Sequence, residues 1–107
     1  MNEIKEYTER MFEDIKHIDE NGNEYWEARE LQHTLSYKEW RKFNNVINKA
    51  KISCNNSRIH IFDHFVELDK MVAIGSGAKR NQLDYKLSRY ACYLIVQNSD
   101  SSKEVIA

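Results

Sequence analysis

The stretch Trp26 to Ala50, WEARELQHTLSYKEWRKFNNVINKA, decides the fold that this sequence predicts. Apolar residues recur at helical spacing in both of its halves, which predicts two short amphipathic helices joined by a turn at Ser36 and Tyr37. The apolar positions are Ala28, Leu31 and Leu35 in the first helix and Trp40, Phe43, Ile47 and Ala50 in the second. Ser36 is suited to cap the second helix, which we expect to end near Ile52 because residues 53–57 are turn-forming.

The second helix carries cations opposite its apolar stripe. Five of them share that face with one acid, Glu39, and they are Lys38, Arg41, Lys42, Lys49 and Lys51. A helix with one buried face and one solvated basic face is suited to contact a phosphate backbone. The pattern therefore favours a binding module over an enzyme. The alternative is an ordinary pair of core helices, because the glycine typical of a helix-turn-helix turn is missing and Ser36 stands near that place.

Charge is distributed unevenly along the chain. The formal net charge is −1, but residues 1–35 hold ten acidic and four basic side chains, whereas residues 36–58 hold one acidic and six basic. Local charge is therefore more informative about partners than the total. Two interpretations are open: the basic segment is left free for a polyanion, or it pairs with the acidic segment inside the fold.

Length and composition predict one globular domain. A chain of 107 residues with 41% hydrophobic and 11% aromatic residues can bury a single core. No apolar run suits a membrane span or a signal peptide, which predicts a cytoplasmic location with Cys54 and Cys92 as reduced thiols. Ser101 and Glu104 form a capping-box pattern that opens a helix, so we expect this chain to be the N-terminal part of a longer protein.

The N-terminal segments predict a helix or ordered arm over residues 1–13, followed by a β-hairpin. Residues 15–18 and 24–26 are predicted to be its strands, because Asn21-Gly22 suits a type I′ turn between them. The expected opposite pairs are Ile18 with Tyr25 and His17 with Trp26.

A second hairpin is predicted in the C-terminal half. Residues 60–62 and 64–68 are rich in apolar residues and are predicted to be strands or strand edges. Gly75-Ser76-Gly77 breaks the chain, and we expect residues 71–75 to pair with residues 83–87 around it.

Ser88 is predicted to cap a helix from Arg89 to Asn98 that is apolar nearly all round and therefore buried. Together these elements predict an α+β fold over residues 1–107. The expected architecture is a small single domain in which β-hairpins pack against helices, with a helix-turn-helix-like pair and a buried C-terminal helix.

No constellation in the sequence predicts catalysis. Cys54, His60 and His64 have the composition of a metal site, but a strand would place the two histidines too far apart to ligate one ion. No Gly-x-Ser-x-Gly motif or activated cysteine–histidine spacing is present. The segment GSGAKR at 75–80 lacks the ending of a phosphate-binding loop. We therefore predict no enzyme activity, no cofactor and no metal site.

The candidate nucleic-acid contacts come from the second helix and from the predicted hairpin tip. A basic loop at a hairpin tip beside a helical pair is the arrangement of a winged-helix protein, in which such a loop contacts the DNA backbone. Arginine, lysine and asparagine supply the donors that reach phosphates and base edges. The predicted contacts are Lys38, Arg41, Lys42, Asn45, Lys49, Lys79 and Arg80.

Several stretches resemble the bacterial DNA-damage-inducible protein D family. They are FEDIKH (12–17), EYWEAREL (24–31), YKEWRKF (37–43), DHFV (63–66), KMVAIGSGA (70–78) and DYKLSRYACYLIVQN (84–98). The layout, a hairpin followed by W-x-A-R-x-L and an L-S-R-type segment, is similar to the N-terminal domain shared by phage antirepressors and viral BRO proteins, which is associated with DNA binding.

The resemblance implies a non-enzymatic role in the bacterial DNA-damage (SOS) response, acting on DNA or on recombinase filaments assembled on DNA. It implies no site residue by residue, so the predicted contacts rest on the charge pattern. The expected partners are single- or double-stranded DNA, a recombinase and further copies of this chain, with no membrane. The alternative is a protein–protein module, antirepressor-like or recombinase-modulating, that makes no contact with DNA.

Overall fold

Five helices and a four-stranded antiparallel sheet in the order β1-β2-β4-β3 are formed within residues 2–99, which the computed structural model describes, with residues 2–7 described by their backbone alone. The elements are α1 (Asn2–Ile15), β1 (His17–Ile18), β2 (Glu24–Glu27), α2 (Ala28–Thr34), α3 (Trp40–Asn56), α4 (Ile61–His64), β3 (Phe65–Ala73), β4 (Lys79–Leu87) and α5 (Arg89–Asn98). The predicted α+β class is confirmed, with its two hairpins, its helical pair and its buried last helix.

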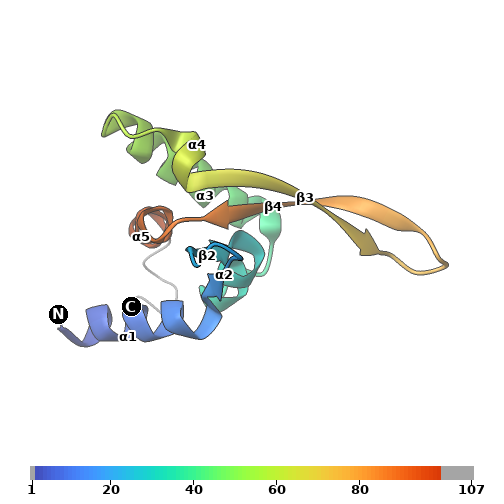
Figure 1. Ribbon diagram of the computed structural model, residues 1–107, viewed down its shortest axis with the longest axis horizontal. Helices are drawn as coiled ribbons and strands as arrows, with labels where there is room; N and C mark the ends of the chain where they lie inside the picture. Colours follow the sequence, from blue (N-terminus) through green and yellow to red (C-terminus); the bar gives the residue numbers. More distant parts are fainter. Residues whose placement is uncertain (1, 100–107) are drawn as a thin grey trace.

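The core lies where α3 and α5 pack on each other beside the sheet (Figure 1). Phe12 and Trp26 have no exposed surface and meet edge to face, with ring centroids 5.8 Å apart. Trp26 Nε1 donates a 2.8 Å hydrogen bond to the carbonyl oxygen of Phe12, which satisfies the one polar atom of the indole. Cys54 of α3 and Cys92 of α5 are free thiols with no exposed surface.

Three helix bounds differ from those expected. α1 extends to Ile15, so this residue belongs to a helix and not to the first strand. α3 continues past Ile52 to Asn56, because the buried Cys54 extends its apolar stripe by one more turn. Residues 61–64 form the short helix α4 in place of part of a strand.

The turn between α2 and α3 forms where predicted, but Ser36 does not cap α3. Ser36 has a φ of 65°, and Glu39 occupies the N-cap without a side-chain hydrogen bond to the helix. Ser36 thus takes the left-handed backbone that glycine usually supplies in such a turn. Gln32 Nε2 holds the turn by donating a 3.0 Å hydrogen bond to the carbonyl oxygen of Tyr37.

The first hairpin pairs one residue away from the predicted register. His17 lies opposite Tyr25 rather than Trp26, and Ile18 lies opposite Glu24 rather than Tyr25. The cause is Asp19, whose carboxylate accepts 2.9 Å hydrogen bonds from the amides of Asn21 and Asn23. These bonds hold residues 19–23 as a longer loop in place of the two-residue type I′ turn.

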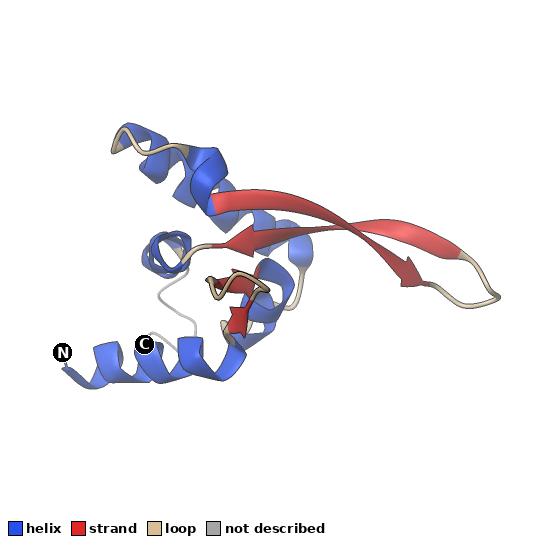
Figure 2. Cartoon of the chain, viewed as in Figure 1, coloured by secondary structure: helices blue, strands red, loops and turns tan. Residues whose placement is uncertain are grey.

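β3, β4 and the turn between them form a long hairpin, here called the arm, which projects beyond the helices (Figures 1 and 2). Its glycine turn lies where predicted. The register pairs Phe65 with Leu87 and Ala73 with Lys79, so residues 83–87 pair with 65–69 and not with 71–75. The prediction was wrong because it left residues 79–82 unpaired, whereas a tight turn closed by the hydrogen bond from the Ile74 amide to the Ala78 carbonyl oxygen starts β4 at Lys79.

α5 begins as predicted, because the Ser88 hydroxyl accepts a hydrogen bond from the amide of Ala91 at 3.0 Å. No helix within residues 2–99 is both long enough and apolar enough to cross a bilayer. The capping-box pattern at Ser101 and Glu104 lies outside the described residues.

Candidate nucleic-acid interface

One face of α3 is exposed and free of acids. The 17 residues of α3 include no aspartate or glutamate. Phe43 and Ile47 point into the core, whereas the polar residues on the opposite side are exposed. We call these the basic face of α3, and they are Arg41, Lys42, Asn45, Asn48 and Lys49. Lys38, also exposed, precedes them in the turn.

Two of these cations stand where they weaken the helix. The amino end of a helix carries partial positive charge, so a cation in its first turn costs about 0.3–1 kcal/mol. Arg41 and Lys42 lie in the first turn of α3, which holds no acid. Glu39 is 3.7 Å from Arg41 Nη2 and 3.4 Å from Lys42 Nζ, yet these side chains remain 76% and 63% exposed. Fold stability therefore does not account for the two cations.

The seven predicted contacts fall into two groups. Lys38, Arg41, Lys42, Asn45 and Lys49 lie on or beside the basic face of α3. Lys79 and Arg80 lie at the far end of the arm, away from α3 (Figure 1). Lys51, which the sequence placed with the cations of α3, instead has its Nζ 4.5 Å over the ring of Tyr85 and donates to its hydroxyl at 3.0 Å.

The acidic N-terminal segment pairs with cations outside α3. Its ion pairs there are Glu9 and Glu24 with Arg89, Asp19 with Lys86, and Glu27 with Lys70. Among the side chains described, Glu39 is the single acid that forms an ion pair with the basic face of α3. In the part of the chain that the structure describes, no acid of residues 1–35 forms an ion pair with a cation of residues 36–58.

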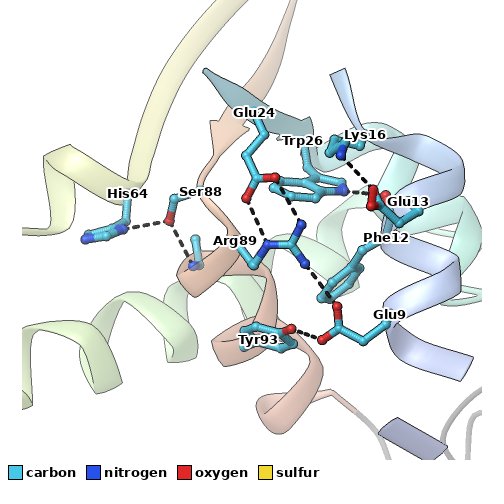
Figure 3. A network of polar contacts seen from close by, with 11 residues as sticks. Glu9, Phe12, Glu13, Lys16, Glu24, Trp26, His64, Ser88, Arg89 and Tyr93 are labelled. Atoms are coloured by element: carbon cyan, nitrogen blue, oxygen red, sulfur yellow. Dashed lines mark hydrogen bonds and ion pairs between the residues drawn. The ribbon is translucent and has the colours of Figure 1, made fainter. Parts of the chain in front are cut away.

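Arg89 joins α1, β2 and α5 through a network of carboxylates (Figure 3). Its Nε and Nη2 donate to the two carboxylate oxygens of Glu24 at 2.8 and 3.0 Å, and its Nη1 donates to Glu9 at 3.1 Å. Glu9 also accepts a hydrogen bond from the Tyr93 hydroxyl. The paired hydrogen bonds between Arg89 and Glu24 raise the pKa of the guanidinium and lower the pKa of the carboxyl. The polar groups of this network bind one another and thereby hold three elements of the fold together.

A buried carboxylate fastens the arm to the body. Asp84 has no exposed surface, and its Oδ1 accepts from the amides of Arg29 and Tyr85 at 3.0 and 2.7 Å. Lys70 Nζ lies 3.0 Å from Asp84 Oδ2 and 2.8 Å from Glu27 Oε1. Burial alone lowers the pKa of Lys70, but its contacts with Glu27 and Asp84 outweigh burial and raise that pKa.

The part of the arm around Lys70 and Asp84, here called the arm root, also joins the arm to the helical pair of α2 and α3. The Arg29 guanidinium lies 3.9 Å over the ring of Trp40, and its Nε donates to the carbonyl oxygen of Leu83 at 3.0 Å. Trp40, the first residue of α3, stacks on Tyr85 with ring centroids 6.5 Å apart. The start of α3 and the root of the arm are therefore one packed unit. Sequence reasoning missed this role, because Asp84 stands in a strand of mixed polar and apolar residues with no sign of its burial.

Cys54 and His64, two of the three residues considered for a metal site, have structural partners. Cys54 Sγ donates to the carbonyl oxygen of Ile59 at 3.5 Å, and His64 Nδ1 lies 2.6 Å from the Ser88 hydroxyl that caps α5. Burial raises the pKa of the Cys54 thiol, which disfavours the thiolate form that binds metals.

A different group, His17, Glu27 and Glu30, has possible ligand atoms within 4.8 Å of one another. His17 Nε2 is 2.5 Å from Glu30, and Glu27 is bound by Lys70. These ion pairs account for the group without an ion.

Comparison with known proteins adds a family and a relative. The family model for the BRO family, N-terminal domain, matches residues 14–107. The chain is 55% identical over 96 residues to DNA damage-inducible protein D of Escherichia coli (strain K12). That similarity covers 90% of this chain and 35% of the relative's length. No solved structure matches. The resemblance that the sequence motifs indicated is confirmed.

Proposed function

We propose that this chain, which belongs to the family of BRO N-terminal domains, is a non-catalytic DNA-binding domain of a bacterial DNA-damage response protein. The name of the Escherichia coli relative, DNA damage-inducible protein D, supports the link to DNA damage. Because this chain spans 35% of that relative's length, the activity of the whole protein is part of the proposal.

The observation that carries the proposal is the basic face of α3. An exposed helix face without acids holds its potential positive, because no carboxylate on the helix neutralises it. Arg41, Lys42 and Lys49 supply cations for phosphates. Asn45 and Asn48 lie among them and offer amide donors and acceptors to phosphates or base edges. Lys38 adds a further cation in the turn before the helix.

Binding without catalysis is supported by the state of the titratable groups. Groups with shifted pKa values, such as Glu24, Lys70 and Arg89, take part in ion pairs that join elements of the fold. An acid or base that works in catalysis would have to be free to exchange protons with a substrate.

One observation favours a second candidate, a protein–protein module. Ile52 continues the exposed side of α3 and is 61% exposed, which suits a protein partner such as a recombinase. Docking of this kind would survive removal of the DNA and would depend weakly on salt.

The test is a salt series of binding titrations with single- and double-stranded DNA of equal length. The variant Arg41→Glu/Lys42→Glu is expected to lose about 100-fold in affinity, and the slope of log K against log salt is expected to fall by about 2 units. A recombinase added without DNA forms the second arm of the experiment.

Arg41→Glu and Arg10→Glu form the matched pair of single variants. Both arginines are exposed, on α3 and α1 respectively, and both substitutions change the net charge equally. The proposal requires Arg41→Glu to weaken binding more than Arg10→Glu does. Equal losses would mean that only total charge matters, and unchanged affinity in the double variant would reject the basic face as the DNA site.

A further inference from the structure

The distal arm, defined as residues 71–82, stands apart from the core (Figures 1 and 2). Every residue in it is exposed except Val72 and Gln82, which are half-buried. β2 pairs with β4 only at Leu87 and Lys86, so the outer part of the arm is a two-stranded ribbon with both edges unpaired. Such a ribbon has little stability of its own in water, so a partner has a reason to cover it.

The two strands of the distal arm differ in chemistry. β4 begins with four consecutive hydrogen-bonding residues, Lys79, Arg80, Asn81 and Gln82. The facing part of β3 and the turn carry apolar side chains, of which Met71 is 62% exposed and Ile74 is 55% exposed. The register places Met71 opposite Asn81 and Val72 opposite Arg80, so donors and apolar groups are mixed on both sides of the ribbon.

The charge of the distal arm selects the kind of partner. Residues 71–82 contain two cations and no acid. The distal arm carries cations and apolar side chains together. A DNA groove offers matching partners for both, because phosphates line its edges and less polar sugars and bases lie between them. Proteins that bind the minor groove use Arg, Lys, Asn and Gln together with apolar wedges such as Ile and Met, which unstack a base step and bend the duplex.

We propose that the distal arm enters the minor groove of double-stranded DNA and bends the duplex. Lys79 and Arg80 contact the phosphates that line the groove, while Met71 and Ile74 press on the sugars and on a base step. This inference rests on the proposed function, and it adds duplex DNA as the substrate and deformation as the result.

The root of the arm makes the mechanism workable. The ion pairs of Lys70 with Glu27 and Asp84, together with the stacking of Trp40 on Tyr85, couple the ribbon to the start of α3. The longest dimension of the molecule is 49 Å, and one turn of B-DNA rises about 34 Å. The proposal places the basic face of α3 and the distal arm on the same duplex. Because the ribbon is fixed at its root, insertion of its tip into the groove bends the DNA and does not simply move the arm.

The test is energy transfer between dyes at the two ends of a 30-base-pair A·T-rich duplex, saturated with the chain. The wild-type chain is expected to bring the ends closer, and distamycin, which fills the minor groove, is expected to compete. Met71→Ser/Ile74→Ser is expected to keep its affinity within about tenfold and to lose the bend, because apolar wedges rather than charges deform the base step. Phe62→Ser, which removes an exposed apolar side chain of α4, is the matched control and is expected to keep the bend.

Lys79→Gln/Arg80→Gln addresses the phosphate contacts of the arm. It is expected to weaken duplex binding about tenfold and to lower the salt slope by about 2 units. Urea unfolding of each variant shows whether the body stays folded, and an intact body is expected because all four side chains lie outside the core.

Several results would overturn the proposal. They are binding without a change in energy transfer, an equal bend in Met71→Ser/Ile74→Ser, and an absence of competition by distamycin, which would place the ribbon in the major groove. A change from dimer to monomer in the Met71→Ser/Ile74→Ser variant, with bending unchanged, would make the arm a contact between copies of this chain. Binding of single-stranded DNA alone through Arg41 would overturn the arm proposal and leave the proposed function standing. Bending that persists in Arg41→Glu/Lys42→Glu with full affinity would support the arm proposal and reject the basic face of α3 as the DNA site.

Discussion

Arg89 and Arg41 show two uses of the same side chain in one small domain. Arg89 is bound by two carboxylates, lies 5.1 Å over the ring of Trp26 and joins three elements. Arg41 has one acid within reach, at 3.7 Å, which it shares with Lys42, and its side chain is 76% exposed. Acids of the N-terminal segment thus pair with Arg89, while Arg41 stays largely exposed to solvent.

The contrast between Arg89 and Arg41 shows how a chain of nearly zero net charge can present a basic surface. Acidic and basic side chains pair with each other at the Arg89 network and at Lys70 in the arm root. The basic face of α3 stays positive because acids within reach are few. Substitutions at the paired cations should therefore change stability, and substitutions at the exposed cations should change binding.

The largest expected effect on stability lies at the arm root, where Asp84 is the fully buried member of an ion pair. Asp84→Ala is expected to lower the free energy of unfolding by about 3 kcal/mol, because it leaves Lys70 and two backbone amides without their shared acceptor. Urea unfolding followed by circular dichroism measures this loss. Asp63→Ala, at an exposed acid of α4, is the control and should stay within about 0.5 kcal/mol. Equal losses at the two acids would show that burial of Asp84 carries no special weight.

The comparison of the two arginines can be tested directly. Arg89→Ala is expected to cost about 1–2 kcal/mol of unfolding free energy, because it breaks a two-pronged ion pair and a second carboxylate contact that are only partly shielded from water. Arg41→Ala is expected to change the same quantity by less than about 0.5 kcal/mol. If both substitutions destabilise equally, the division between structural and free cations fails.

Low pH is expected to destabilise the fold through the carboxylates that pair with Arg89. The hydrogen bonds from Arg89 lower the pKa of Glu24 below its ordinary value of 4.5. The unfolded chain therefore binds more protons than the folded chain in this range, so the stabilisation is present above that value and is lost as the pH falls through the lowered pKa. Melting temperatures measured from pH 7 down to pH 3 should decline less steeply in Glu24→Gln than in the wild type. Identical declines would contradict the assignment.

The smallest expected effect has the opposite sign. Arg41→Gln/Lys42→Gln is expected to raise the unfolding free energy by about 0.5 kcal/mol, because it removes cations from the positive end of the α3 dipole. Lys49→Gln, in the middle of the helix, serves as the control and should leave stability unchanged. A loss of stability in the double variant would indicate that Glu39 holds the two cations for structural reasons.

The sequence predicted what periodicity and capping determine. The apolar steps from Trp40 to Ala50 placed the helical pair correctly, and Ser88 marked the start of α5, because both signals act over a few residues. The glycines of the arm turn were recognised for the same reason. The basic face of α3 also follows from helical spacing, since one buried stripe fixes which residues are exposed.

What the sequence did not predict depends on side chains that meet from distant segments. The first hairpin slipped by one residue because the Asp19 carboxylate captures two amides, and this choice is invisible to a strand pattern. The arm was longer than expected because its tight turn brings the polar residues 79–82 into the ladder, and polar content did not mark them as a paired strand. Asp84 was missed because its partners Arg29 and Lys70 come from two other elements.

The reactivity of Cys54 and Cys92 can be used to measure how often the core between α3 and α5 opens. Neither thiol has exposed surface, and burial raises the pKa of both, so an alkylating reagent reaches a reactive thiolate only after the chain opens. The rate of alkylation under native conditions therefore reports the opening of the domain without any added probe. The same protection lets a cysteine introduced on the surface be labelled selectively while the two natural ones stay silent.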